Sequence, residues 1–210
     1  MPEHKISYQT QKTYSTLNHI GEKTEYIWFV CHGIGYLSRY FIKYFSVLDA
    51  DKHYIIAPQA PSKYYQDKNY KHIGASWLTR EDTQMEMQNN TAYFNEIYAK
   101  EIQPHRHKKL MILGYSQGVS VAMRWIAQSK IDCESLVIHS GGIPEELNKI
   151  DFEGLTLKPY LVYGKSDPYI NSERAEKEHQ KARKLFGDRL KVIPFEGAHE
   201  VSKQVISQFN

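Results

Sequence analysis

Six apolar runs, rich in β-branched and aromatic residues, recur along the chain, and each gives way to Gly, Pro or Asp. They lie at residues 25–33, 53–58, 109–116, 135–142, 159–167 and 190–197. Within each run the apolar residues are continuous and do not alternate with polar ones, which is typical of strands buried on both faces of a parallel sheet. We therefore expect these runs to be the strands of such a sheet.

Three segments between the runs have the helical period instead. Apolar side chains recur every three or four residues at 37–48 and 87–102, which predicts amphipathic helices. A third helix is expected at 172–186, where Ser172 opens the segment and Gly187 follows it. Strands that alternate with helices predict a mostly parallel, doubly wound α/β sheet.

Two other segments lack this clear periodicity. The first 20 residues alternate weakly, which predicts an antiparallel hairpin at one edge of the sheet. Residues 59–79 contain three Tyr and one Trp between Gly and Pro residues. Connections of that length in a compact domain tend to be functional or disordered. The aromatic side chains favour a packed functional loop over simple surface irregularity.

Length and charge limit the classes of protein that fit. A chain of 210 residues that is 41% hydrophobic is most simply one domain over 1–210, and no repeat or linker interrupts it. The net charge of +3 comes from 27 basic and 24 acidic residues that are spread along the chain. This balance does not favour nucleic-acid binding. The basic cluster HRHKK at 105–109 is interpreted as a solvated loop and not as a phosphate-binding patch.

Neither membrane nor disulfide chemistry is indicated. The N-terminal stretch has no apolar signal-peptide segment, and no window approaches the roughly 20 apolar residues that span a membrane. Cys31 and Cys133 fall in apolar runs without CxxC or Cys/His spacing, so we expect core residues and neither a disulfide nor a zinc site. A cytoplasmic protein without stable membrane insertion is the expectation.

The candidate nucleophile lies in the stretch GYSQG, where a predicted strand meets a predicted helix. Gly114 and Gly118 flank Ser116 in the pattern G-x-S-x-G. Small residues are needed there because a sharp strand-to-helix turn forces the serine into a strained conformation and brings neighbouring segments close. The helix N-terminus also favours negative charge nearby. The structural alternative is a turn serine that caps the helix.

A serine nucleophile needs a base to take its proton and an acid to orient that base. In proteins built on this kind of sheet, the acid and then the histidine follow the serine, each just after a strand. Asp167 and His199 meet both requirements. A turn made with Pro168 is the structural alternative for Asp167.

The other candidates for these two roles are less well placed. Inside an apolar run, His139 is expected to pack beside the active site. The remaining alternatives are His32 and His179 for the base, and Asp151 and Asp188 for the acid.

Acyl transfer also requires hydrogen-bond donors for the oxyanion. The N–H of Gln117, directly after the serine, is one candidate, and the N–H of Ile34, in the loop after an early strand, is the other. The same loop begins like a dinucleotide-binding fingerprint, but Ser38 stands where the third glycine is required. No acidic residue follows the next strand to bind a ribose, so dinucleotide binding is not favoured.

These motifs together resemble one known family. The stretches CHGIG, APQAP, SW, GYSQG, YGKSDP and EGAHEVS occur in the order seen in the phospholipase/carboxylesterase family of α/β-hydrolases, which includes the acyl-protein thioesterases. The resemblance runs from about residue 26 to the C-terminus. It implies an α/β-hydrolase fold without a large cap domain, and a serine esterase with no metal or organic cofactor. The implied residues are Ser116, Asp167 and His199 as triad, with Ile34 and Gln117 as oxyanion donors.

Three positions depart from the family pattern. Tyr36 replaces the usual acid after the HGLG stretch, and Leu78 and Thr79 replace an aromatic residue and an acid after the Trp. These positions bear on the shape of the substrate pocket and not on the triad. We expect Tyr36, Trp77 and Tyr65 to contact the substrate.

The sequence therefore predicts a carboxylesterase that acts on a small ester or acyl substrate. Two alternatives stay open: a lysophospholipase or acyl-protein thioesterase for long acyl chains, and a catalytically silent binding protein on the same fold. The sequence does not distinguish a monomer from a homodimer.

Overall fold

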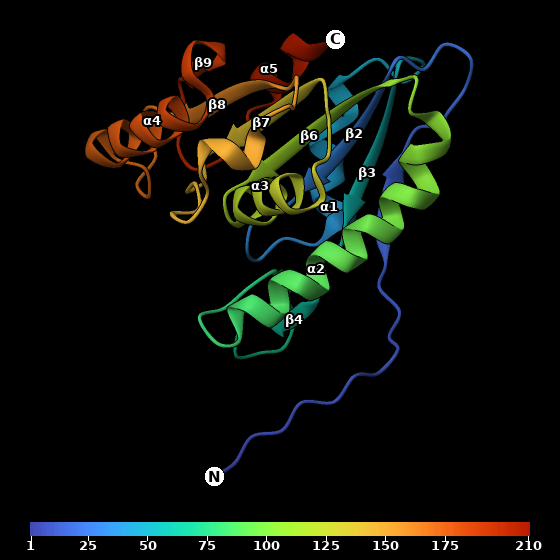
Figure 1. Cartoon of the computed structure of the whole chain (residues 1–210), viewed down its shortest axis with the longest axis vertical. Helices are drawn as coiled ribbons and strands as arrows, with labels where there is room; N and C mark the ends of the chain where they lie inside the picture. The colour runs from blue at the N-terminus through green and yellow to red at the C-terminus, as the bar shows by residue number, and fades with distance from the viewer.

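The computed structural model describes residues 1–210, and its centre is a seven-stranded sheet in the order β1-β3-β2-β6-β7-β8-β9 (Figure 1). All six predicted runs form strands of this sheet, which confirms the α/β expectation. The strands are β1 (Tyr14–Leu17), β2 (Tyr26–Cys31), β3 (His53–Pro58), β6 (Lys109–Tyr115), β7 (Ser135–His139), β8 (Lys158–Gly164) and β9 (Lys191–Phe195).

Within this seven-stranded sheet, every strand pair except β1 with β3 is parallel. Cys31 lies opposite Gly114 between β2 and β6, and Tyr115 lies opposite His139 between β6 and β7. Because parallel strands all end at the same edge, the loops after β2, β6, β7, β8 and β9 gather there. The predicted site residues follow four of these strands.

The N-terminal segment differs in detail from the prediction. β1 does pair in an antiparallel manner at one sheet edge, but its partner is β3 and not a second strand within the first 20 residues. Residues 1–13 form no regular element, and their side chains are exposed. A hairpin arm made of these mostly polar residues would bury little apolar surface, so nothing favours one. Figure 1 shows this segment running away from the sheet.

The two faces of the sheet are covered by different helices. In β2, Ile27 and Phe29 face the larger core beneath α2, α3 and α4, whereas Trp28 and Val30 face the smaller core beneath α1 and α5. α2 and α3 lie against each other (Figure 1). The helices are α1 (Ser38–Phe41), α2 (Thr83–Ile97), α3 (Gln117–Ser129), α4 (Ser172–Phe186) and α5 (Lys203–Ile206).

The predicted helices are confirmed, two of them with a change of type along their length. The segment 37–48 begins as α1 and continues as a 3₁₀ helix, Ile42–Val47. The segment 87–102 is the second part of α2 followed by a π-helical turn, Tyr98–Ile102. Further 3₁₀ turns occur at Gln103–His105, Lys149–Phe152, Gly187–Arg189 and Ser207–Phe209.

Residues 59–79 contain an antiparallel hairpin of β4 (Ser62–Tyr65) and β5 (Ile73–Ser76). The hairpin packs on the loop after β2, since Gly35 N–H donates to Ala75 O at 2.9 Å and Gln66 Nε2 donates to Gly35 O at 2.8 Å. Its tip is closed by the Asp67 carboxylate, which accepts the N–H groups of Asn69, Lys71 and His72. Of the aromatic side chains on which the prediction of a packed loop rested, Trp77 is buried, whereas Tyr64, Tyr65 and Tyr70 are exposed.

Both cysteines are buried free thiols, which confirms that they are core residues. Burial raises the pKa of Cys31 and of Cys133. None of the helices is both long and apolar enough to cross a membrane.

The contact between α3 and β2 yields a testable prediction. A Cβ at residue 118 would overlap the carbonyl oxygen of Cys31, whereas a Cβ at Gly21 would meet no atom within 4 Å. Gly118→Ala should lower the free energy of unfolding by about 3 kcal/mol, because backbone atoms must move. The control Gly21→Ala should change it by less than about 0.5 kcal/mol. Urea denaturation measures both, and equal unfolding midpoints for the two variants would contradict the close contact.

Candidate active site

Ser116 occupies the turn between β6 and α3 with φ 52° and ψ −119°. A positive φ is uncommon outside glycine and stores backbone strain of about 1–3 kcal/mol. Although Ser116 stands at the N-cap position of α3, its side chain makes no capping hydrogen bond to the helix. The structure therefore does not support the alternative of a helix-capping serine.

Three glycines leave room for this turn. A Cβ at Gly114 would overlap the backbone of Val119, and a Cβ at Gly141 would overlap the carbonyl oxygen of Ser116. Together with Gly118 against β2, they let the ends of β2, β6 and β7 close around the serine. The sequence predicted two of these glycines, and Gly141 belongs to the stretch HSGG at the end of β7.

The serine, the histidine and the acid predicted from sequence lie in one hydrogen-bonded row. Ser116 Oγ is 3.0 Å from His199 Nε2, and His199 Nδ1 is 2.7 Å from Asp167 Oδ2. A carboxylate accepts from Nδ1–H, so Nε2 carries the lone pair that faces the hydroxyl. The arrangement can accept a proton from Ser116.

Asp167 is held firmly behind the imidazole. Its side chain is fully buried, and its Oδ1 accepts the N–H groups of Tyr169 at 2.8 Å and Ile170 at 3.1 Å. The Asp167 N–H also donates to Gly164 O at 3.2 Å. Asp167 therefore both forms the turn that was its structural alternative and bonds to His199.

Two tyrosines fix the position of His199. The Tyr169 ring meets the imidazole edge to face at a centroid distance of 4.9 Å, and Tyr115 Oη donates to the carbonyl oxygen of His199 at 3.0 Å. Burial raises the pKa of Tyr115, which keeps its hydroxyl protonated as the donor.

Two of the competing histidines, His32 and His139, are buried and neutral. His139 packs beside the site, as expected: its Nε2 accepts the N–H of Ser202 at 3.2 Å. Burial, with a smaller effect of nearby His199, lowers its pKa to about 3. His32 Nε2 accepts the N–H of Ala60 at 3.1 Å, and its Nδ1 bonds to the carbonyl of the next residue; burial lowers its pKa to about 4. Neither ring bonds to Ser116.

The two predicted oxyanion donors lie beside the serine. Ile34 and Gln117 both line the hollow that contains Ser116. The Ile34 N–H has no acceptor within the protein, and the N–H of the first residue of a helix has no intrahelical acceptor. Both amides are therefore available to an oxyanion.

The Gln117 side chain has a role that the sequence did not reveal. Its Oε1 accepts the N–H of Trp77 at 2.8 Å, and its Nε2 donates to Leu78 O at 2.8 Å. These bonds attach the end of β5 to the start of α3.

Of the three residues expected to contact substrate, the structure brings only Tyr36 to the hollow. The expectation for Trp77 is corrected: it is fully buried, and its indole N–H donates to His32 O at 2.7 Å, so it supports the loop that carries Ile34. Tyr65 is also corrected. It is exposed on β4 and packs edge to face on Tyr70, outside the hollow.

The hollow around Ser116 has a volume of about 520 Å³. Much of its wall comes from the ends of the strands and was not predicted from sequence. The further lining residues are Tyr115, Ser120, Ser140, Gly141, Gly142, Tyr169, Ile170 and Arg174. The stretch HSGG after an apolar run was a usable signal for Ser140 to Gly142, but nothing in the sequence singled out Arg174.

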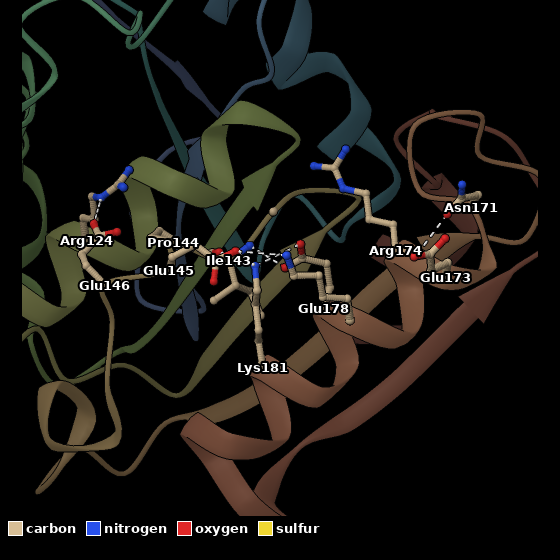
Figure 2. Close-up of a pocket in the computed structure, with 12 residues that line it drawn as sticks. Arg124, Ile143, Pro144, Glu145, Glu146, Asn171, Glu173, Arg174, Glu178 and Lys181 are labelled. Carbon is tan, nitrogen blue, oxygen red and sulfur yellow. Dashed lines mark hydrogen bonds and ion pairs between the residues drawn. The ribbon is translucent and has the colours of Figure 1, made fainter.

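A second hollow of about 680 Å³ adjoins the first and shares Gly142 and Arg174 with it (Figure 2). Its wall is mostly charged and carries none of the three residues of the hydrogen-bonded row. Nowhere does the structure gather three or more His, Cys, Asp or Glu side chains into a group that could hold a metal ion.

Known proteins are similar to this chain in sequence pattern and in fold. A family model described as phospholipase/carboxylesterase matches residues 13–209. Among solved structures, acyl-protein thioesterase 2 from Zea mays superposes with a TM-score of 0.69 at 16% identity, covering 95% of this chain and 98% of that one. Among curated protein sequences, none matches the chain.

Two further solved structures are similar over nearly the whole length. Esterase PE8 has a TM-score of 0.71 at 18% identity, covering 95% of this chain and 98% of that one. A phospholipase/carboxylesterase from Dyadobacter fermentans DSM 18053 has a TM-score of 0.67 at 18% identity, covering 96% and 97%. The α/β-hydrolase fold without a large cap is thereby confirmed.

The two buried histidines predict acid sensitivity. Because the pKa values of His32 and His139 are lowered to about 4 and about 3, the unfolded chain binds more protons than the folded one below about pH 6.5. Stability is therefore retained above that pH and lost as the pH falls toward 4, by up to about 1.4 kcal/mol per pH unit for each histidine. His139→Gln should reduce this slope, whereas His4→Gln, at an exposed position, should not. Urea denaturation between pH 7.5 and 4.5 tests this, and an unchanged slope in His139→Gln would contradict it.

Proposed function

The chain belongs to the phospholipase/carboxylesterase family and is a serine ester hydrolase, and we propose that it cleaves carboxylic esters through an acyl-enzyme formed on Ser116. The observation that carries the proposal is the row from Ser116 Oγ through His199 to Asp167, with distances of 3.0 and 2.7 Å. This order of acceptor and donor atoms is the one that general-base activation of a serine requires.

In the first half of the reaction, Ser116 Oγ attacks the ester carbonyl carbon while His199 Nε2 takes the hydroxyl proton. Asp167 stabilises the imidazolium that forms. The negative charge on the carbonyl oxygen is met by the N–H groups of Ile34 and Gln117. When the tetrahedral intermediate collapses, His199 gives its proton to the leaving oxygen, and the alcohol departs.

In the second half, water takes the place of the alcohol. His199 removes a proton from the water as it attacks the acyl carbon, and the proton then returns to Ser116 Oγ as the acyl bond breaks. The products are a carboxylic acid and an alcohol, and a thioester would give a thiol by the same steps. No group beyond this chain and water takes part in the proposed steps.

The hollow supports a small ester more than a long acyl chain. Its wall interrupts the side chains of Ile34, Tyr36, Tyr115, Tyr169 and Ile170 with hydrogen-bonding groups from Ser120, Ser140 and the backbone of Gly141 and Gly142, and a long acyl chain would leave those groups unpaired. The long-chain alternative draws on the exposed apolar side chains of Ile34 and Tyr169 at this site and on the likeness to an acyl-protein thioesterase. The presence of all three triad candidates speaks against a silent binding protein.

Removing the proposed nucleophile tests the assignment. Ser116→Ala should lower kcat on 4-nitrophenyl acetate by at least about 10⁴-fold and abolish labelling by a fluorophosphonate probe, with an unchanged circular dichroism spectrum. The control Ser129→Ala, at the far end of α3, should keep both. Folded wild-type protein that does not react with the probe would overturn the proposal.

A series of 4-nitrophenyl esters tests the acyl length. We expect kcat/KM to peak at acyl chains of about two to four carbons, because Ser120, Ser140 and Arg174 interrupt the apolar part of the wall. A steep rise of kcat/KM with chain length, measured below the critical micelle concentration of each ester, would instead support the lysophospholipase or thioesterase alternative.

A further inference from the structure

Arg174 is the only Lys, Arg, Asp or Glu residue that lines the hollow around Ser116. It lies in the first turn of α4, where its side chain is exposed and borders both hollows. The carboxylate of Asp167 is buried behind His199 and does not line the wall, and that of Glu178, beside Gly142, lines only the adjoining hollow. A charged substrate group in this hollow would therefore meet Arg174 before any other ion.

The other cations of the adjoining hollow are already paired. Arg124 pairs with Glu146, and Lys181 pairs with Glu145 at 2.7 Å and with Glu178 at 3.4 Å. Lys177 pairs with Glu145 at 3.5 Å. In Figure 2 no dashed line joins the Arg174 guanidinium to this ion-paired group.

Arg174 has no such partner. Glu178, one turn further along α4, accepts the N–H of Ile143 at 2.8 Å and forms an ion pair with Lys181. Glu173, its neighbour in the helix, forms no ion pair either. The Arg174 guanidinium therefore forms no ion pair, whereas Arg124, Lys177 and Lys181 in the wall of the adjoining hollow each pair with a glutamate.

The guanidinium is nevertheless held in place. Its Nη1 donates to Tyr169 O at 3.0 Å, while the N–H of Tyr169 donates to the Asp167 carboxylate at 2.8 Å. A Cβ at Gly142 would lie 3.4 Å from Arg174 Nη2 and 3.7 Å from Glu178 Oε1, so both groups border this glycine. One short loop therefore positions both the proposed acid and this arginine, and the remaining Nε and Nη2 donors have no acceptor in the protein.

We propose that Arg174 binds a carboxylate carried by the substrate, so that the preferred ester is one with a negatively charged group on its acyl or its alcohol part. The inference rests on the proposed function of Ser116 and names the substrate class of that site. The planar fork of a guanidinium matches the two oxygens of a carboxylate. An uncharged ester of the same length leaves those donors unused, so the discrimination comes from this one contact.

The test uses two pairs of esters with the full-length protein at low ionic strength. Monoethyl glutarate carries a carboxylate on the acyl side and is compared with ethyl pentanoate. 4-Acetoxybutanoate carries it on the alcohol side and is compared with pentyl acetate. Hydrolysis is followed by pH-stat, and the measured quantity is the ratio of kcat/KM for the charged ester to that for its neutral counterpart.

We expect this ratio to be about ten or more for at least one pair in the wild type, and the pair concerned identifies the side that carries the carboxylate. Arg174→Gln should bring the ratio to about one, whereas Lys177→Gln, which removes a paired cation from the same helix, should leave it unchanged. The ratio in the wild type should also fall as salt is added.

Two results would overturn the proposal: a wild-type ratio of one or less for both pairs, or the same ratio in Arg174→Gln as in the wild type. If all four esters and 4-nitrophenyl acetate are left intact and the fluorophosphonate does not label Ser116, the proposed function fails and this inference fails with it. Turnover of the neutral esters without a preference for the charged ones overturns the role of Arg174 alone.

Discussion

The site depends on one close approach of backbone to backbone, where Gly118 of α3 lies against the carbonyl of Cys31 at the end of β2. Because α3 begins so near to the strand, the chain must turn within a single residue, and Ser116 takes up the positive φ that this turn demands. The same approach brings the first N–H of α3 beside the loop that carries Ile34. The Ser116 hydroxyl and the N–H groups of Ile34 and Gln117 therefore lie together because of this one contact. A helix that started further from β2 would separate all three.

Much of this arrangement followed from the sequence because its causes are local. Continuous apolar runs specify strands buried on both faces, and the glycines around Ser116 specify the turn. Asp167 and His199 could be picked out because the carboxyl ends of parallel strands meet at one edge. The failures have a different origin. Trp77 looked like a pocket residue, but its position depends on bonds to His32 and Gln117, which are 45 and 40 residues away in the chain. Arg174 gave no signal, because its lack of a partner is a property of how Arg124, Lys177 and Lys181 are paired in space.

The charges around the site are few because two histidines next to it stay neutral. His32 and His139 are buried on the two sides of β6, one at the end of β2 and the other at the end of β7. Each accepts a backbone N–H through Nε2. A proton on either ring would place a cation in the interior and break that hydrogen bond. Unlike these two rings, His199 holds no backbone N–H and bonds to Ser116 Oγ instead.

The hairpin of β4 and β5 contacts the loop after β2 through Gln66, whose Nε2 donates to Gly35 O, and contacts the site through its base. The Gln117 side chain bonds to the backbone of Trp77 and Leu78, and the Trp77 indole donates to His32 O in the loop after β2. At the tip, the Asp67 carboxylate accepts the N–H groups of Asn69 and His72. The base and the tip of the hairpin are therefore held by different hydrogen bonds. The exposed side chains of Lys68, Asn69 and Lys71 make no contact with the residues around Ser116, so this stretch of the tip can vary in sequence, or accept an inserted recognition segment, while Asp67 and Gln66 keep their bonds.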